Sequence, residues 1–80
     1  MSLKLNIVSP EKVMYTGEVE SVQVPGTLGS FEILTDHAPI ISSLQKGVIE
    51  YTNKEGKKQL AIAAGFVEVQ KNEVRICVEV

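Results

Sequence analysis

The last seven residues, Val74–Val80 (VRICVEV), alternate between branched apolar side chains and a second set made of Arg, Cys and Glu. A period of two places alternate side chains on opposite faces of an extended chain, which is typical of a half-buried β-strand. The same alternation occurs near the start of the chain, where Leu3, Leu5 and Ile7 are separated by Lys4 and Asn6. Both ends of the sequence therefore predict β-strands with one apolar face.

Composition extends this prediction to the whole chain. Val, Ile and Thr supply 22 of the 80 residues, against four Ala, and branched side chains favour pleated sheets. No helical period of apolar residues is sustained. We expect an all-β fold, a sandwich of two antiparallel sheets with about ten short strands, in one domain spanning residues 1–80. The segments expected as strands are 3–7, 13–16, 19–24, 31–34, 40–44, 48–52, 58–63, 66–69 and 74–80.

Turn-forming residues separate these segments. Gly17 predicts a bulge or bend that divides the run 13–24 into two strands. Residues 25–30 and 35–39 read as connections, and residues 71–73 as a turn. Residues 53–57 (NKEGK) predict a hairpin turn in which Gly56 takes the left-handed position.

Several classes of protein are excluded by composition and charge. The single Cys77 cannot form an internal disulfide, so we expect a reducing compartment. No apolar run is long enough to span a membrane, and the first residues resemble neither a signal nor a transit peptide. The net charge of −2 gives no basic footprint for nucleic acid.

Candidate chemical sites are few. Cys77 and His37 could form a catalytic pair, but a half-buried thiol in a strand is the simpler interpretation. A lone His37 does not supply the converging ligands of a metal site, and the Gly26–Gly29 loop lacks the Lys and following helix of a phosphate-binding loop. Lys54 at a hairpin tip resembles the attachment lysine of lipoyl or biotinyl carrier domains, although Asn53 and Glu55 flank it. We expect no catalytic residue, cofactor or small-molecule ligand.

The block from Gly29 to Pro39 (GSFEILTDHAP) combines a glycine loop, an apolar strand and a His-Ala-Pro sequence. Small, turn-forming and aromatic residues together on a β scaffold suit a protein-docking surface. The alternative is a structural turn in which His37 fixes the backbone.

At this block the chain resembles the β-sandwich domain of the epsilon subunit of the F-type ATP synthase, which is called delta in mitochondria. The resemblance covers nearly the whole length and depends on an ordered set of short matches rather than on any single one. These matches are Val8–Glu11, Tyr15–Val19, Val22–Gly26, Gly29–Leu34, His37–Pro39, Leu44, Gly47 and Ala64–Val69.

The resemblance implies two five-stranded antiparallel sheets and a non-catalytic, mechanical role in the central stalk of the rotary enzyme. The partners it implies are the gamma subunit and the membrane-embedded c-ring, whose rotation the domain would couple to ATP synthesis. The domain would then be peripheral to the cytoplasmic face of a bacterial membrane. By position, Gly29, Ser30 and Phe31 are expected to face the c-ring. The residues expected to face gamma are Ser9, His37, Ala38, Ile40, Ile41 and Ser42.

One departure from the family pattern concerns length. Many members carry a helical hairpin after the sandwich, which inhibits ATP hydrolysis and in some of them binds ATP. The present sequence stops at Val80, so these roles are not carried over to it. The coupling ion, H⁺ or Na⁺, is determined by another subunit and cannot be read from this sequence.

Overall fold

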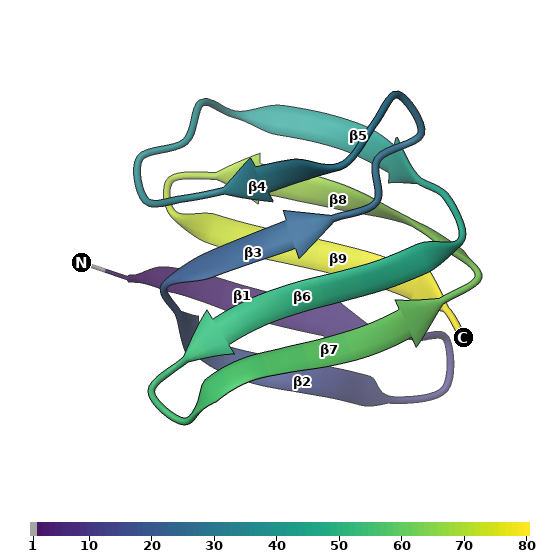
Figure 1. The fold of residues 1–80 in the computed structure, drawn as a ribbon, viewed down its shortest axis with the longest axis horizontal. Coiled ribbons are helices and arrows are strands. Elements are labelled where there is room, and N and C mark those ends of the chain that lie inside the picture. The colour runs from purple at the N-terminus through teal and green to yellow at the C-terminus, as the bar shows by residue number, and fades with distance from the viewer. Residues whose placement is uncertain (1) are drawn as a thin grey trace.

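A computed structural model describes residues 2–80 and confirms an all-β sandwich, with nine strands in two sheets (Figure 1). Met1, part of the predicted domain, lies outside the described residues. The strands are β1 (Leu3–Val8), β2 (Val13–Val19), β3 (Ser21–Val24), β4 (Phe31–Ile33), β5 (Ile40–Leu44), β6 (Gly47–Asn53), β7 (Gly56–Ile62), β8 (Ala64–Gln70) and β9 (Glu73–Glu79). No helix in residues 2–80 is long and apolar enough to cross a membrane.

The strand order is β2-β1-β9-β8-β5 in the five-stranded sheet and β4-β3-β6-β7 in the four-stranded sheet. All neighbours are antiparallel except β1 and β9, which run parallel with Leu5 opposite Val74. The five-stranded sheet is therefore mixed, and the second sheet has four strands rather than five. The parallel pair is possible because β1 and β9 are separated by seven other strands, so no tight hairpin dictates their relative direction.

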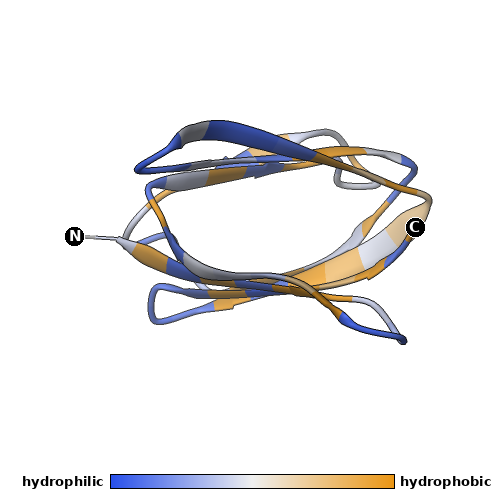
Figure 2. Ribbon diagram, turned by 90° about the horizontal axis from the view of Figure 1, so that it is seen from below, coloured by the Kyte–Doolittle hydropathy of each residue, from blue (hydrophilic) through white to orange (hydrophobic). Residues whose placement is uncertain are grey.

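The core lies between the two layers, which Figure 2 shows edge-on. It is formed by the inward-facing residues of both sheets, and no polar side chain in residues 2–80 is buried in it. Its members are Leu3, Leu5, Ile7, Val19, Val22, Val24, Ile33, Leu44, Ile49, Ile62, Val67, Val69, Val74, Ile76 and Val78. The alternation read from the sequence accounts for most of them. Val80, expected on the same face, instead lies beyond β9 and is 68% exposed.

The prediction of a break at Gly17 is wrong. Strand β2 continues through Gly17, which pairs with Leu5, and the bulge lies at Met14, where the register shifts between Ile7 and Val8. The Tyr15 side chain lies across Gly17, with the hydroxyl oxygen 2.8 Å from the position a Cβ would take. The chain changes sheets at Glu20, whose N–H donates to the carbonyl of Thr52 (2.7 Å).

The two layers are joined differently along their two sides. On one side Tyr15 of β2 packs against Tyr51 of β6, with ring centroids 4.5 Å apart, and the Asn53 amide donates to the Tyr15 hydroxyl (3.3 Å). Partial burial, and then the neighbouring Tyr15, raise the pKa of Tyr51 above its ordinary value. On the other side an isolated antiparallel bridge joins Gly26 to Leu44 of β5.

Two predicted turns are confirmed. Lys54 and Glu55 connect β6 to β7, the Asn53 side chain accepts from the Glu55 N–H (2.8 Å), and Gly56 has φ of 112°. Lys71 and Asn72 connect β8 to β9 with φ of 50° and 61°, the positive values that favour a tight hairpin with right-handed strand twist.

Candidate interaction surfaces

The loop of residues 25–30, between β3 and β4, is held by backbone hydrogen bonds to residues 43–45 and by one bond within the loop itself. The Thr27 N–H donates to the Ser43 carbonyl (3.1 Å), and the Gln45 N–H donates to the Pro25 carbonyl (2.9 Å). Within the loop, the Gly29 N–H donates to the Gly26 carbonyl (3.0 Å). These bonds attach the loop to β5 and to the residue after it, so this end of the sandwich is a fixed structure.

Close packing inside this loop explains two of its residues. A Cβ at Gly26 would lie 2.7 Å from the Gly29 carbonyl oxygen and 2.9 Å from the Phe31 ring, so only glycine fits there. Phe31 is half-buried and packs against the core. Of the three residues predicted to face the c-ring, Gly29 and Ser30 are exposed, whereas the Phe31 ring lies against Gly26. The side chain that projects from the loop is Leu28, which sequence reasoning missed.

The connection of residues 34–39 lies at the opposite end of the sandwich (Figure 1) and is held by side chains. The Asp36 N–H donates to the Asn72 side-chain oxygen (2.6 Å), and the Asn72 amide donates to the Asp36 carboxylate (3.3 Å). Asp36 has φ of 63°, and the His37 N–H donates to the Leu34 carbonyl (3.2 Å). The His37 Nδ1 lies 2.8 Å from the carbonyl oxygen of Ala38, so the ring contacts the adjacent backbone.

The residues predicted to face gamma do not lie on one surface. Ile40 and Ser42 alternate with Ile41 along β5; Ile40 packs against the core, and Ile41 points outward and is 75% exposed. His37 and Ala38 lie near the β8–β9 turn, whereas Ser9 follows β1 at the opposite end of the five-stranded sheet. The Ser9 hydroxyl accepts from the Lys12 N–H (3.2 Å) and donates to the Lys12 carbonyl (3.1 Å), so it organises its own turn.

An apolar hollow of about 350 Å³ lies on the outer face of the five-stranded sheet, beside Ser9. Cross-strand pairing explains it, because Val8 pairs with Cys77 and Cys77 with Phe66. Phe66 is 48% exposed, and Ser43, which pairs with it, lies two residues from Ile41 on the same outward face of β5. The sequence signal for this surface was the position of Phe66, one residue before the buried Val67 and hence on the outward face.

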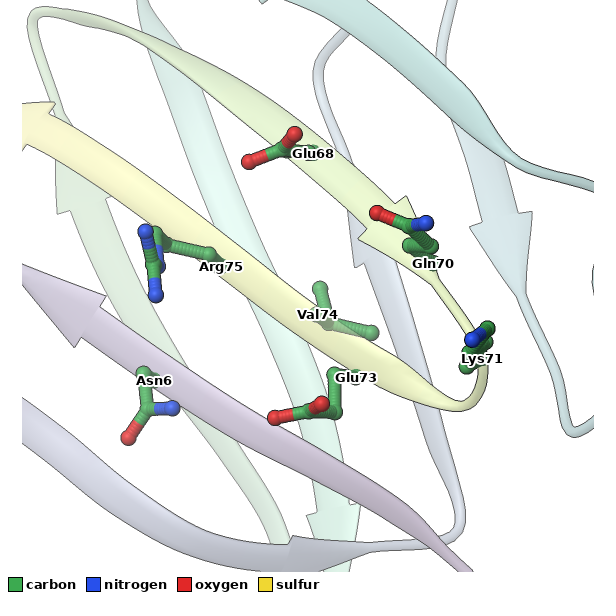
Figure 3. A pocket seen from close by; sticks show the side chains of 7 residues that line it. All are labelled: Asn6, Glu68, Gln70, Lys71, Glu73, Val74 and Arg75. Atoms are coloured by element: carbon green, nitrogen blue, oxygen red, sulfur yellow. The ribbon is translucent and has the colours of Figure 1, made fainter.

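The other half of the same outer face is polar, with a hollow of about 460 Å³. Figure 3 shows Glu68 of β8, Arg75 of β9 and Asn6 of β1 along it, and these three residues lie in one cross-strand row. The outer face of the four-stranded sheet is also polar. There the Lys57 Nζ lies 3.7 Å from the Glu50 Oε1. The polar hollow has no group of three metal-ligating side chains, nor has any other part of residues 2–80.

The structure separates the two residues considered for a catalytic pair. Cys77 lies near the end of β9, between Phe66 and Val8, whereas His37 follows Asp36, which is bonded to Asn72 just before β9 begins. Lys54 is exposed in its hairpin turn, as predicted, between Asn53 and Glu55. What the geometry offers at the surface is a loop fixed by hydrogen bonds at one end and an apolar hollow on one face.

Comparison with known proteins identifies the family of the chain. Residues 2–80 match the profile of the family described as ATP synthase, Delta/Epsilon chain, beta-sandwich domain. The chain belongs to this family. Among curated members, the ATP synthase epsilon chain of Leptospira interrogans is 45% identical over 74 residues, covering 92% of this chain and 58% of that protein. The epsilon chain of Helicobacter pylori is 46% identical over 74 residues, covering 92% of this chain and 60% of that protein.

Two solved structures contain a chain with the same fold. A chain in the cryo-EM structure of the Euglena gracilis mitochondrial ATP synthase superposes with a TM-score of 0.89, at 21% identity, over 96% of this chain and 50% of that one. A chain in the central stalk and c-ring structure of the Tetrahymena thermophila mitochondrial ATP synthase gives 0.82, at 16% identity, over 100% and 65%. The present chain thus spans less than two thirds of the length of these two curated relatives and of the two structurally matched chains.

Proposed function

We propose that this domain is a non-catalytic part of the central stalk of a proton- or sodium-translocating F-type ATP synthase. In this role it helps to fix the c-ring to the gamma subunit, so that ion-driven rotation of the ring reaches the nucleotide sites. The observation that carries the proposal is the family match over residues 2–80, together with curated relatives named as ATP synthase epsilon chains. The domain then lies on the cytoplasmic face of a bacterial membrane, attached through the complex.

The fold suits a part that transmits torque. A coupling element must not shear, and here a continuous apolar core joins two layers that are also bridged along both sides by Tyr15–Tyr51 and Gly26–Leu44. Close-packed interiors have low compressibility and transmit strain. The sandwich can therefore pass force from one end or face to another.

The surfaces described above supply two contacts in this proposal. The end loop, with Gly29, Ser30 and Phe31, faces the c-ring. The gamma subunit contacts the outer face of the five-stranded sheet, where Ile41 and the apolar hollow beside Ser9 offer exposed apolar surface. Apolar area of this kind is typical of the buried centre of a protein interface. Phe66 joins this second set, and His37 and Ala38 extend it toward the β8–β9 turn. Ile40 and Ser42 belong to β5 itself and alternate with Ile41 along it.

Co-purification tests the assignment. A tagged chain expressed in its native host is expected to co-purify with an ATP-hydrolysing complex that contains gamma and the c-ring, and failure to do so would remove the proposal. Mass spectrometry of the same sample should find Lys54 unmodified, since a lipoyl or biotinyl group there would indicate a carrier domain.

Two substitutions then test the placement of the contacts. Ser30→Trp adds a large side chain to the exposed end loop, and His37→Glu adds charge at the opposite end of the sheet. Ser30→Trp is expected to weaken binding to the ring, and His37→Glu to weaken binding to gamma while leaving ring binding unchanged. If Ser30→Trp binds the ring with wild-type affinity, the end loop does not face it.

A further inference from the structure

One row of outward-facing side chains crosses all five strands of the five-stranded sheet and carries no charge. Its successive cross-strand pairs are Val13 with Val8, Val8 with Cys77, Cys77 with Phe66 and Phe66 with Ser43. Four of these five side chains are apolar, and Val13 is 61% exposed and Phe66 48%. The apolar hollow lies beside this row, which we call the uncharged row. A continuous apolar strip on an open sheet face is typical of a surface that another molecule covers.

The central strand, β9, places opposite charges on the two sides of the uncharged row. Its outward side chains are Glu73, Arg75, Cys77 and Glu79 in order, so Arg75 precedes the row by one step and Glu79 follows it by one step. Both side chains are exposed, and neither forms a salt bridge within residues 2–80. This holds even though Glu68 on β8 is the cross-strand neighbour of Arg75 (Figure 3).

This pattern of charge is self-complementary about Cys77. A second copy related by a two-fold axis along the uncharged row lays its sheet on the first, with each strand opposite the same strand running the other way. The two Phe66 rings then meet, and Arg75 of each copy lies opposite Glu79 of the other. Opposite charges that face one another across a contact fix its register and disfavour other arrangements.

Other two-fold arrangements of the same face use its charges less well. An axis that runs parallel to the strands along β9 sets Arg75 against Arg75. An axis midway between β8 and β9 sets Arg75 against Glu68, but it leaves Glu79 without a partner and β2 uncovered. The axis along the uncharged row overlaps all five strands and pairs both charges, so it is the arrangement that the face favours.

We propose that the free domain forms a weak two-fold dimer through the outer face of the five-stranded sheet, with Cys77 at the axis and an Arg75–Glu79 pair on each side. Five strands span roughly 20 Å and three rows about 14 Å, so each copy buries on the order of 300–500 Å². This area is below the ~800 Å² per partner of a stable complex, and the dimer therefore exchanges with the monomer. The inference does not depend on the proposed function. Because the proposed gamma contact uses the same face, the dimer belongs to the domain before assembly.

Sedimentation equilibrium of the 80-residue chain, from about 10 μM to about 1 mM, tests the dimer and its face. Wild type is expected to approach the dimer mass over this range. Phe66→Ser should associate at least roughly 10-fold more weakly, since the buried ring is lost. The control Val48→Ser, at a 47% exposed position on the outer face of the four-stranded sheet, should match wild type. A wild type that stays monomeric overturns the dimer, and wild-type association of Phe66→Ser overturns the face.

Charge reversal tests the register. Arg75→Glu alone puts two carboxylates into each contact, and Glu79→Arg alone puts two guanidinium groups there, so each variant should associate roughly 10-fold more weakly than wild type. A mixture of the two restores opposite charges in both contacts and should associate like wild type, as measured by energy transfer between dyes on the two variants. Glu32→Arg, on the outer face of the other sheet, is the control and should not change association.

Thermal unfolding shows that each variant is folded before its association is compared. A mixture of Arg75→Glu and Glu79→Arg that associates no better than either variant alone overturns the proposed register. Rescue of Arg75→Glu by Glu68→Arg instead would assign the axis between β8 and β9, and it would overturn the Arg75–Glu79 contact.

Discussion

The two connections that flank β4 achieve the same end by different means. The loop 25–30 is fixed by backbone-to-backbone bonds, carries no charge and presents a free leucine. The connection 34–39 is fixed by the side chains of Asp36 and Asn72, and its leucine at position 34 is half-covered. Backbone bonds leave the side chains of a loop free for a partner, whereas side-chain bonds occupy them. Under the proposed function, the first connection is the one suited to docking and the second is the one that closes the fold.

The largest effect is expected from a substitution in β4, the strand that supports both connections. Ile33 in β4 is fully buried between them, and Ile33→Ala should lower the free energy of unfolding by about 2–5 kcal/mol through lost burial and a cavity. Urea unfolding measures this loss, and amide exchange should rise in both connections. The control Leu34→Ala, on the adjacent and exposed residue, should cost under about 1 kcal/mol. Equal losses for the two variants would show that β4 does not anchor the connections.

A smaller effect is confined to the first connection. Gly26→Ala places a Cβ against the Gly29 carbonyl and the Phe31 ring, and overpacking of this kind costs about 1–3 kcal/mol. Thermal unfolding measures the cost, and amide exchange should rise in residues 25–31 but not in 34–39. Ser30→Ala, at an exposed position of the same loop, is the control and should be close to neutral. Wild-type stability of Gly26→Ala would contradict the packing described here.

The second connection is tested at Asn72. Asn72→Gly removes both side-chain bonds to Asp36 while keeping a residue that tolerates the positive φ, so the loss should be about 1–2 kcal/mol. Amide exchange should rise in residues 34–39 and remain unchanged in 25–31. Lys71→Gly, at the other positive-φ position of the same turn, should cost less. A rise in exchange at both connections would mean that they are not independent.

The smallest effect concerns pH and should not distinguish the connections at all. The pKa of Tyr51 is raised in the folded state above the ordinary 10.0, so the unfolded chain releases this proton first as the pH rises. Stability from Tyr51 is therefore complete below pH 10 and is lost as the pH rises through the folded pKa. Urea unfolding from pH 8 to 11 measures the free energy of unfolding of wild type and of Tyr51→Phe. Above pH 10 the value for wild type should fall relative to the value for the variant. A difference independent of pH would contradict the shift.

Sequence alone identified the first and last strands of the chain, most of the core and the hairpin turns. Alternation with a period of two and turn chemistry are local properties, so they can be read without the fold. The family resemblance, too, rested on local matches. The mistakes occurred where distant residues meet. Gly17 looked like a bend because its pairing with Leu5 in the neighbouring strand β1 cannot be read from the residues around it. The half-burial of Phe31 was also missed, because the core that it packs against is assembled from strands far apart in the sequence.

What the sequence determined by itself was therefore the type of each element and the face that each strand buries. Tertiary structure decided the rest: the parallel pairing of β1 with β9, the separation of Ser9 from His37, the gathering of Phe66, Cys77 and Val8 into one hollow, and the projection of Leu28. The physical reason is that strand faces follow from neighbours in the chain, whereas exposure depends on which distant backbone comes to lie beside a residue. In this protein the candidate docking surfaces are properties of that second kind.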